Sequence, residues 1–332
     1  MRVYWSGAAD ATPSVKEADM GGLLILCPGQ GSQAPGMAEY LWDHPVARGT
    51  FAEAGDTLGW DVGELCRHGS MEELTRTDRT QLAILTCSVA VWRVLADRGA
   101  TCAVAAGHSL GEYSALVATG HMAFADALRV VDVRGRGMQT CAERRGGTMA
   151  AIIGLESGIV EEICACIPEV WVANYNSPGQ VVISGSIEGV RAAGERAGTE
   201  GARRILPLPV SGAFHTPFMD GAAEALAEAL AGVRFAAGRA RFFSTTELRY
   251  PEPGELADVL SRQLMSPVRF TQSMEMLLGG ADAPDRGLEV GPGEVLTGLV
   301  KRIRRDLPIA ATGDADALQK ALAAEAETRR PR

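Results

Sequence analysis

The pattern of apolar and polar positions predicts that the ordered part of the chain begins with a buried strand at Leu23. LLILCPG is apolar up to its Pro-Gly pair, which is typical of a parallel strand that is covered on both faces and then enters a loop. CAVAAG (102–107) is a second buried strand by the same argument. Between them, over about 78–98, apolar residues recur with helical spacing on one face. We therefore expect a parallel α/β sheet here.

A different pattern occupies about 147–210 and predicts a separate small subdomain. Four runs there have the character of strands: TMAAIIGL, VWVANYN, QVVISGS and ARRILPLPV. Two runs between them are helical: SGIVEEICACI and IEGVRAAGERAGTEG. The resulting order, βαββαβ, is that of the ferredoxin-like fold. After this insertion, a helical segment at 217–231 and an apolar run at 288–290 return the chain to the first layer.

These patterns divide the 332 residues into four parts. The predicted fold class is α/β, with a parallel-sheet core and an inserted ferredoxin-like subdomain. We expect a flexible N-terminal extension at 1–21, a large α/β subdomain formed by 22–146 and 211–324, the small subdomain at 147–210, and a flexible tail at 325–332.

Composition predicts a globular protein of the cytoplasm. Hydrophobic residues make up 46% of the chain and charged residues 22%, which is ordinary for a soluble domain. The net charge of −9 argues against binding to nucleic acid or to an anionic membrane surface. The first 20 residues show no secretory signal, and no apolar run reaches the length that spans a bilayer. Seven cysteines without a CxxC pair or zinc spacing predict reduced thiols and no metal site.

GHSLGEY (107–113) contains the pattern Gly-x-Ser-x-Gly, which is short enough to occur by chance. Its context favours a functional interpretation, because a buried strand precedes it and the helical run EYSALVATG overlaps its end. Strand, tight turn and helix are the surroundings that a nucleophile elbow needs. Ser109 is therefore a candidate nucleophile, and it requires a general base and donors for an oxyanion.

His215 is the candidate base among the five histidines. It lies in PVSGAFHTPFM, where the small subdomain returns to the large one, and pockets form at such junctions. A loop or capping role for His215 stays open. For the oxyanion, one donor is expected at Gln30 in the turn GQGSQ and another at the amide of Leu110, although a plain βα turn explains GQGSQ equally well.

Arg134 is a charged residue on the apolar face of the helical run ALRVVDVRGRGMQ. A guanidinium directed toward a core requires an anionic or equivalent partner, because an unpaired buried charge is very unfavourable. One interpretation is an internal pair with an acidic residue of this chain. The other is a carboxylate of the substrate, which the rigid fork of arginine recognises well.

Seven motifs occur in one order along the chain: GQGSQ, GHSLGEY, VRGRGMQ, NYNSPGQVVISG, AFHTPFM, RQLMSPVRF and EVGPGEVLTGL. With this set the chain resembles the malonyl-CoA:acyl carrier protein transacylases and the related acyltransferase domains of fatty acid and polyketide synthases. The resemblance covers about residues 23–305 and implies a hydrolase-like α/β core with the inserted ferredoxin-like subdomain.

The resemblance also implies catalytic roles. Ser109 becomes the nucleophile that carries a malonyl ester, and His215 becomes its general base. Gln263 matches the glutamine whose main-chain carbonyl orients the histidine, while Gln30 and Leu110 match the amides of the oxyanion hole.

Four further residues match positions near the substrate. Arg134 corresponds to the arginine that holds the malonyl carboxylate, and Gln81 and Asn174 correspond to residues beside the pocket. Phe214, like the leucine after the nucleophile, resembles members that select malonyl over methylmalonyl groups. Gly212 stands where modular synthases often have a bulkier residue.

The implied activity is ping-pong transfer of a malonyl group from malonyl-CoA to the phosphopantetheine thiol of an acyl carrier protein, without a metal or redox cofactor. Two alternatives stay open. The first is a hydrolase of the same fold, and Arg134 argues against it because this residue suits a dicarboxylic acyl group. Against a non-catalytic docking module stand the intact Ser109, His215 and Gln263.

The acidic carrier protein would have to dock on a local basic surface, since the chain itself is acidic. Two clusters are candidates for this surface, and each is otherwise a solvated face. The first is Arg203 with Arg204, and the second is KRIRR, which contains Lys301, Arg302, Arg304 and Arg305.

Overall fold

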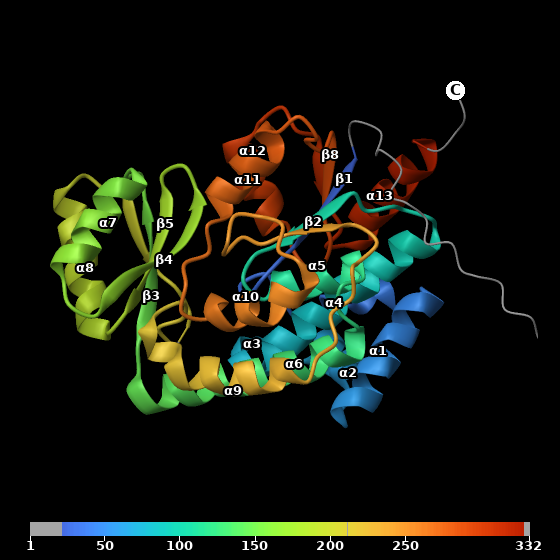
Figure 1. Cartoon of the computed structure of the whole chain (residues 1–332), viewed down its shortest axis with the longest axis horizontal. Helices are drawn as coiled ribbons and strands as arrows, with labels where there is room; N and C mark the ends of the chain where they lie inside the picture. The colour runs from blue at the N-terminus through green and yellow to red at the C-terminus, as the bar shows by residue number, and fades with distance from the viewer. Residues whose placement is uncertain (1–21, 211, 329–332) are drawn as a thin grey trace, which may run out of the picture.

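A computed structural model describes residues 22–210 and 212–328, and it contains two separate sheets (Figure 1). The larger sheet has the strand order β7-β2-β1-β8-β9, and each of its pairings is parallel. Its strands are β1 (Leu23–Cys27), β2 (Val104–Gly107), β7 (Arg241–Phe243), β8 (Arg286–Glu289) and β9 (Ile309–Ala311). The predicted parallel α/β core is therefore confirmed.

The buried character of β1 follows from helices on both faces of the sheet. Leu23 and Ile25 belong to one hydrophobic cluster, whereas Leu24 and Leu26 belong to another. Because successive strand residues point to opposite faces of a sheet, a strand whose two faces are both covered by helices is apolar along its whole length. In Figure 1, α4 and α6 lie below this sheet and α11 and α12 lie above it.

Eleven helices belong to this larger part of the described chain. They are α1 (Pro45–Leu58), α2 (Val62–His68), α3 (Met71–Thr75), α4 (Thr77–Asp97), α5 (Gly111–Thr119), α6 (Phe124–Arg145), α9 (Asp220–Ala231), α10 (Leu256–Gln263), α11 (Phe270–Gly279), α12 (Val295–Ile303) and α13 (Ala315–Glu327). Short 3-10 turns lie at η1 (Glu39–Leu41), η2 (Pro217–Met219) and η3 (Pro253–Glu255).

The smaller sheet is antiparallel and has the order β4-β5-β3-β6. Its elements follow the chain order β3 (Thr148–Ile153), α7 (Ser157–Cys166), β4 (Val170–Ser177), β5 (Gln180–Gly185), α8 (Ile187–Thr199) and β6 (Arg204–Pro207). This is the predicted βαββαβ insertion. Both helices pack on one face of the sheet around a cluster of their own, and together they form the left-hand part of Figure 1.

An isolated β-bridge connects β4 of the small sheet with the larger part of the chain. The amide of Tyr175 in β4 donates to the carbonyl of Val268 (2.8 Å), and the amide of Val268 donates to the carbonyl of Ala173 (2.9 Å). Val268 lies between α10 and α11 of the larger part. These bonds hold β4 against the segment that follows Gln263, a candidate site residue.

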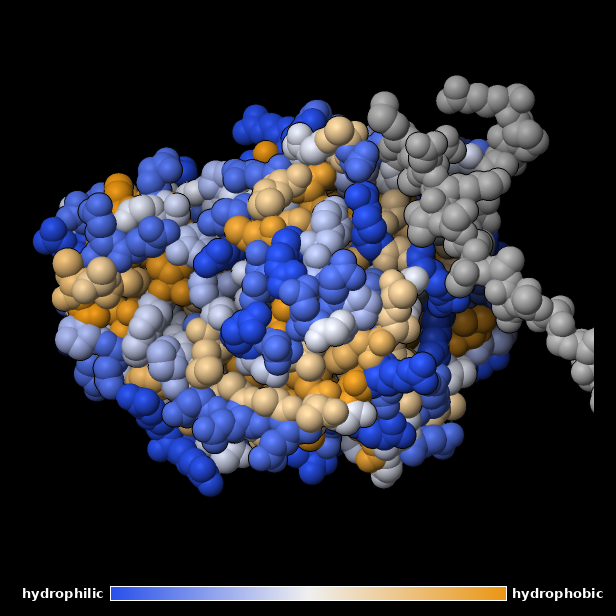
Figure 2. Space-filling model, viewed as in Figure 1, coloured by the Kyte–Doolittle hydropathy of each residue, from blue (hydrophilic) through white to orange (hydrophobic). Residues whose placement is uncertain are grey.

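α4 is the one described helix that is long and apolar enough, by length and composition, to cross a membrane. Its apolar 18-residue window is 78% buried inside the protein, so this helix serves as a core element. Hydrophilic residues cover most of the face drawn in Figure 2, with apolar side chains in patches between them.

The predicted start of the flexible tail, residue 325, lies within a helix. α13 continues to Glu327, and the buried carboxylate of Glu325 pairs with the guanidinium of Arg286 (Nε to Oε1, 3.1 Å). The partner lies 39 positions away, so the local sequence AETRRPR contains no sign of it. The expected flexible segments 1–21 and 329–332 lie outside the described residues.

Candidate active site

Ser109 lies on the turn between β2 and α5, with a φ of 52°. The two glycines of the motif are required by close packing around this turn. A Cβ on Gly107 would collide with the main chain of Gly111, and a Cβ on Gly111 would collide with the carbonyl of Cys27 in β1. A left-handed, tightly packed strand-to-helix turn is the geometry of a nucleophile elbow, which favours the functional interpretation of the motif over chance.

His215 contacts the candidate nucleophile directly. Its Nε2 lies 2.8 Å from Ser109 Oγ, and its Nδ1 lies 3.0 Å from the main-chain carbonyl oxygens of both Gln263 and Ser266. Carbonyl oxygens only accept, so Nδ1 carries the proton and Nε2 is free to accept the proton of the serine. This arrangement orients the histidine without a carboxylate.

The pKa of His215 is lowered to about 3, first by burial and then by the nearby charge of Arg134. The imidazole is therefore neutral over the physiological range and available as a base. His215 also has a φ of 61°, in the left-handed region that only a minority of residues other than glycine adopt. Strain of this kind collects at functional sites.

Arg134 lies on α6, is 1% exposed, and reaches the nucleophile from the core. Its Nη1 donates to Gln81 Oε1 (2.6 Å), and its Nη2 donates to Ser109 Oγ and Gln263 Oε1 (both 3.0 Å). Its buried Nε has no partner in the described part of the chain. Burial lowers the pKa of this guanidinium, which thus lies in an environment that does not favour its charge.

No carboxylate lies within ion-pair distance of Arg134 among residues 22–210 and 212–328. The protein-side partners of the guanidinium are neutral amide and hydroxyl groups. The internal ion pair considered from the sequence is thus not found in this part of the chain, and the positive charge stays available for an external anion.

The turns that contain Gln30 and Leu110 lie side by side at one edge of the larger sheet. Cys27 and Gly107, the last residues of β1 and β2, are register partners, and a Cβ on Gly29 would collide with the carbonyl of His108. Neither the amide of Gln30 nor that of Leu110 donates to an acceptor within the described ranges. Two free amides beside a nucleophile are what an oxyanion hole requires.

Asn174 and Phe214 contribute less directly. Asn174 pairs through its main chain with Val268, and no hydrogen bond joins its side chain to the described groups around Ser109. Phe214 is buried in the main core, where a Cβ on Gly212 would approach its ring to 2.6 Å. A bulkier residue at position 212 would therefore displace the Phe214 ring.

Two polar residues of the site were not predicted from the sequence. Asn176 Oδ1 lies 2.9 Å from Nε2 of His108, the neighbour of the nucleophile. The carboxylate of Glu112 accepts from Gln263 Nε2 (2.6 Å), which also donates to the carbonyl of Ser109 (3.0 Å). The available signal for Glu112 was an acidic residue within an otherwise apolar, buried first turn.

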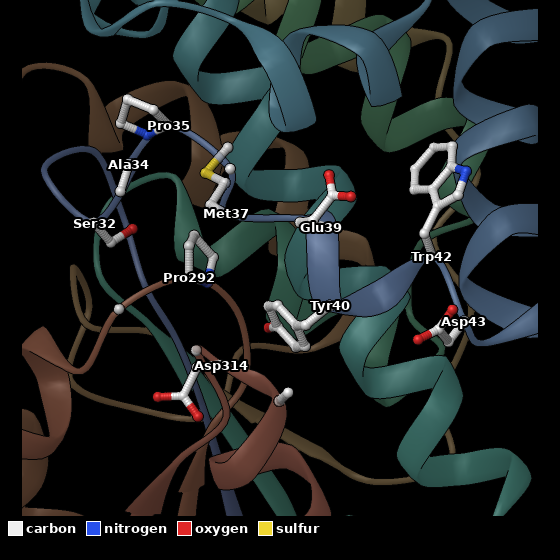
Figure 3. A pocket seen from close by; sticks show the side chains of 14 residues that line it. Ser32, Ala34, Pro35, Met37, Glu39, Tyr40, Trp42, Asp43, Pro292 and Asp314 are labelled. Atoms are coloured by element: carbon white, nitrogen blue, oxygen red, sulfur yellow. The ribbon is translucent and has the colours of Figure 1, made fainter.

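A hollow on the surface is separate from this site. It has a volume of about 750 Å³, and its walls come from the loop after β1 and from the turns that follow β8 and β9. Figure 3 shows Ser32, Met37 and Tyr40 opposite Pro292 and Asp314. None of the groups in contact with Ser109 lines this hollow, so the hollow is not part of the candidate active site.

A serine on an elbow after a parallel strand, with a neutral histidine at its hydroxyl, is characteristic of α/β proteins that form acyl esters. The comparisons with known proteins agree with this class. The family model described as "Acyl transferase domain" matches residues 25–324. The chain therefore belongs to the acyl transferase family.

Named relatives within this family are malonyl CoA-acyl carrier protein transacylases. The chain is 44% identical over 304 residues to the protein of Salmonella typhimurium, covering 90% of this chain and 98% of the relative. It is 40% identical over 309 residues to that of Bacillus subtilis, covering 91% and 97%.

Solved structures of the family are similar to this chain along nearly its whole length. A malonyl-transacylase in complex with a type II PKS acyl-carrier protein superimposes with a TM-score of 0.88, at 41% identity over 92% of this chain and 100% of that one. An acyl carrier protein S-malonyltransferase from Vibrio cholerae gives a TM-score of 0.85, at 43% identity over 90% and 99%. The hydrolase-like core with its inserted small subdomain is thus the fold of this chain.

Proposed function

We propose that this protein transfers the malonyl group of malonyl-CoA to the phosphopantetheine thiol of an acyl carrier protein, through a malonyl ester on Ser109. The observation that carries the proposal is the buried guanidinium of Arg134, whose Nη2 lies 3.0 Å from Ser109 Oγ. Its partners within the described ranges are neutral, so a substrate anion next to the reacting carbonyl completes its pairing. Malonyl-CoA supplies such an anion in the free carboxylate of its acyl group.

In the first half-reaction, Ser109 Oγ attacks the thioester carbonyl of malonyl-CoA while its proton passes to His215 Nε2. The carbonyl oxygen becomes an oxyanion, and the amides of Gln30 and Leu110 donate to it. The C–S bond then breaks, and CoA leaves as a thiol with the proton that His215 returns. The malonyl group remains on Ser109 as an oxygen ester, with its carboxylate on Arg134.

The second half-reaction repeats these steps with a new nucleophile. The phosphopantetheine thiol of the carrier protein gives its proton to His215 Nε2 and attacks the ester carbonyl. The ester C–O bond breaks, and Ser109 Oγ recovers the proton. Main-chain carbonyls of Gln263 and Ser266 keep the imidazole in the required tautomer throughout.

This chemistry uses protein side chains and amides alone, so we expect no metal or redox cofactor. The proposed partners are malonyl-CoA and an acyl carrier protein, and nucleic acid and membranes are not among them. We place the protein in the cytoplasm, where both partners of fatty acid or polyketide synthesis are found.

Intact mass spectrometry tests the proposal. The protein is mixed with malonyl-CoA, acetyl-CoA or methylmalonyl-CoA, and a holo acyl carrier protein is then added. We expect one malonyl group on the enzyme, and its transfer to the carrier on addition. Loading followed by release of free malonate would support the hydrolase instead, and no loading at all would support the docking module.

A further inference from the structure

Glu112 is fully buried and lies three residues after the nucleophile, in the first turn of α5. Its Oε1 accepts from Ser244 Oγ (3.2 Å), from the Thr245 amide (2.6 Å) and from Thr245 Oγ1 (3.0 Å). Its Oε2 accepts from Gln263 Nε2 (2.6 Å). No cation pairs with it within the ranges that the structure describes. A buried charge held by neutral donors depends on each of them, and the mechanism above leaves this carboxylate without a role.

The carboxylate of Glu112, together with the main-chain carbonyl of Ser109, determines how the side-chain amide of Gln263 is turned, because Gln263 Nε2 donates to both (2.6 and 3.0 Å). An ionised carboxylate only accepts hydrogen bonds, so the NH₂ end of the amide has to face it. The carbonyl end then faces the opposite way, where Arg134 Nη2 donates to it at 3.0 Å. The reversed amide would present an NH₂ donor to a guanidinium that has donors alone, and both contacts would be lost.

We propose that Glu112 is a positioning residue for the malonyl-binding guanidinium, acting through the side-chain amide of Gln263. This inference rests on the proposed function. Glu112 strengthens the direction that the Ser109 carbonyl also requires of the amide. The amide holds Nη2 of Arg134 beside Ser109, and Gln81 holds Nη1 on the other side. A guanidinium held at both ends offers the malonyl carboxylate a fixed fork and loses less rotamer freedom on binding.

The decisive variant is Glu112→Gln, which keeps the size of the side chain and replaces one acceptor oxygen by a donor. The new amide cannot accept from both Thr245 and Gln263, so Gln263 Nε2 keeps only the Ser109 carbonyl of its two acceptors within the described ranges, and the direction of this amide is held less firmly. We expect the ratio of kcat/KM for malonyl-CoA to that for acetyl-CoA to fall about tenfold, the usual effect of losing one hydrogen bond to a charged group. The fall in the ratio should come mainly from a higher KM for malonyl-CoA, and acetyl transfer should change little.

Glu289→Gln is the matched control. Glu289 is also fully buried, and its side-chain oxygens accept from the amides of Leu296 (3.0 Å) and Thr297 (2.7 Å) at the start of α12, not from Gln263 or Arg134. This variant should lose stability in a thermal melt without a change in the malonyl-to-acetyl ratio. An equal fall of the ratio in both variants would make the effect a general consequence of removing a buried charge and would overturn the proposal.

Gln263→Met supplies a second route to the same test, because it removes both amide ends and keeps the main-chain carbonyl at His215. Its malonyl-to-acetyl ratio should fall as in Glu112→Gln, and the double variant should fall no further than Gln263→Met alone. Unchanged ratios, or independent losses that add, would overturn the inference. If Glu112→Gln does not fold, the ratio of Gln263→Met decides. Failure of the wild type to load malonyl would instead reject the proposed function.

Discussion

Arg134 and Ser109 are in direct contact although 25 positions separate them in the chain: Nη2 of the arginine donates to Oγ of the serine at 3.0 Å. The same hydroxyl lies 2.8 Å from His215 Nε2. One oxygen is therefore shared by the group proposed to remove its proton and the group proposed to bind the substrate carboxylate. In the proposed mechanism, acyl selection and nucleophile activation therefore meet at this one atom.

Ser109→Ala should abolish covalent loading by malonyl-CoA, because no other nucleophile contacts the imidazole of His215 in the described structure. The measurement is intact mass after incubation with malonyl-CoA. Ser114→Ala is a matched control on α5, the helix that follows the turn of Ser109, since the buried hydroxyl of Ser114 has no hydrogen-bond partner within the described residues. A malonyl adduct on Ser109→Ala would show that the nucleophile is another residue.

His215→Ala should lower the rate of acylation about 10²–10⁴-fold, the usual contribution of a positioned base. Quenched-flow measurement of malonyl-enzyme formation gives this rate directly. A rate close to that of the wild type would assign the base to another group. Circular dichroism of the variant separates loss of the base from loss of the fold.

The pH profile of acylation follows from the pKa of His215, which burial and Arg134 lower to about 3. The base form then persists well below the pKa of a free imidazole, about 6.5. The rate of acylation should show no inflection near pH 6.5 and should fall only in more acidic solution. In Arg134→Ala the inflection should move to higher pH, because one cause of the lowered pKa is removed.

The lowered pKa of His215 also determines how the stability of the folded protein changes with pH. Between about pH 3 and 6.5 the unfolded chain binds a proton at this histidine that the folded chain does not, so unfolding takes up a proton. The contribution of His215 to stability is full above the unfolded pKa and is lost as the pH falls toward the folded one. Chemical denaturation at a series of pH values should show a smaller slope in His215→Ala over this window.

Arg134→Ala should lower kcat/KM for malonyl-CoA at least about tenfold, equivalent to about 1.4 kcal/mol. Its activity toward acetyl-CoA, relative to wild type, should rise, since an uncharged acyl group no longer leaves a buried guanidinium unpaired. Arg134→Lys should recover little, because a point charge lacks the two-pronged fork. An unchanged malonyl-to-acetyl ratio in the alanine variant would locate acyl selection elsewhere.

The two basic clusters considered for carrier docking are brought together by the β4–β5 hairpin. The side chain of Arg203 packs over Gly154, whose amide donates to the carbonyl of Gly179 (2.8 Å), and Arg302 Nη1 donates to Gln180 Oε1 (2.9 Å). One arginine of each cluster therefore lies next to this hairpin. An acidic carrier protein would meet both clusters at once.

Reversal of charge in the double variant Arg203→Glu, Arg302→Glu should raise KM for the carrier protein and leave self-loading by malonyl-CoA intact. Arg129→Glu is the control, because among the described residues Arg129 pairs only with Asp126 at the surface of α6, which Figure 1 draws on the opposite side of the molecule from α12. Unchanged carrier kinetics in the double variant would remove these two arginines from the docking site.

Gly111→Ala should destabilise the protein by about 2 kcal/mol or more, because the tightly packed turn has no space for an added methyl group. Its Cβ would collide with the carbonyl of Cys27, whereas a Cβ on Gly298 of α12 meets nothing within 4 Å. Gly298→Ala should therefore be neutral or stabilising by up to about 1 kcal/mol, from helix propensity. Urea denaturation of the two variants measures the difference.

The sequence by itself determined the elements whose causes are local. The apolar run LLILC predicted a strand covered on both faces, and GHSLG, between a strand and a helical run, predicted a tight turn, because these signals lie within a few residues of each other. The βαββαβ subdomain was also predictable, because its strands and helices follow one another with short connections. The placement of Arg134 on a buried helix face followed from helical periodicity alone.

Only the tertiary structure decided which polar groups meet. Arg134 contacts Gln81 and Gln263 at separations of 53 and 129 positions, Glu112 contacts Gln263 at 151, and Glu325 contacts Arg286 at 39. Periodicity states which face of a helix is buried, but the packing of one element against another sets the partner of each side chain on that face. The neutral surroundings of Arg134, and the carboxylate of Glu112 behind Gln263, therefore emerge only when the chain is folded.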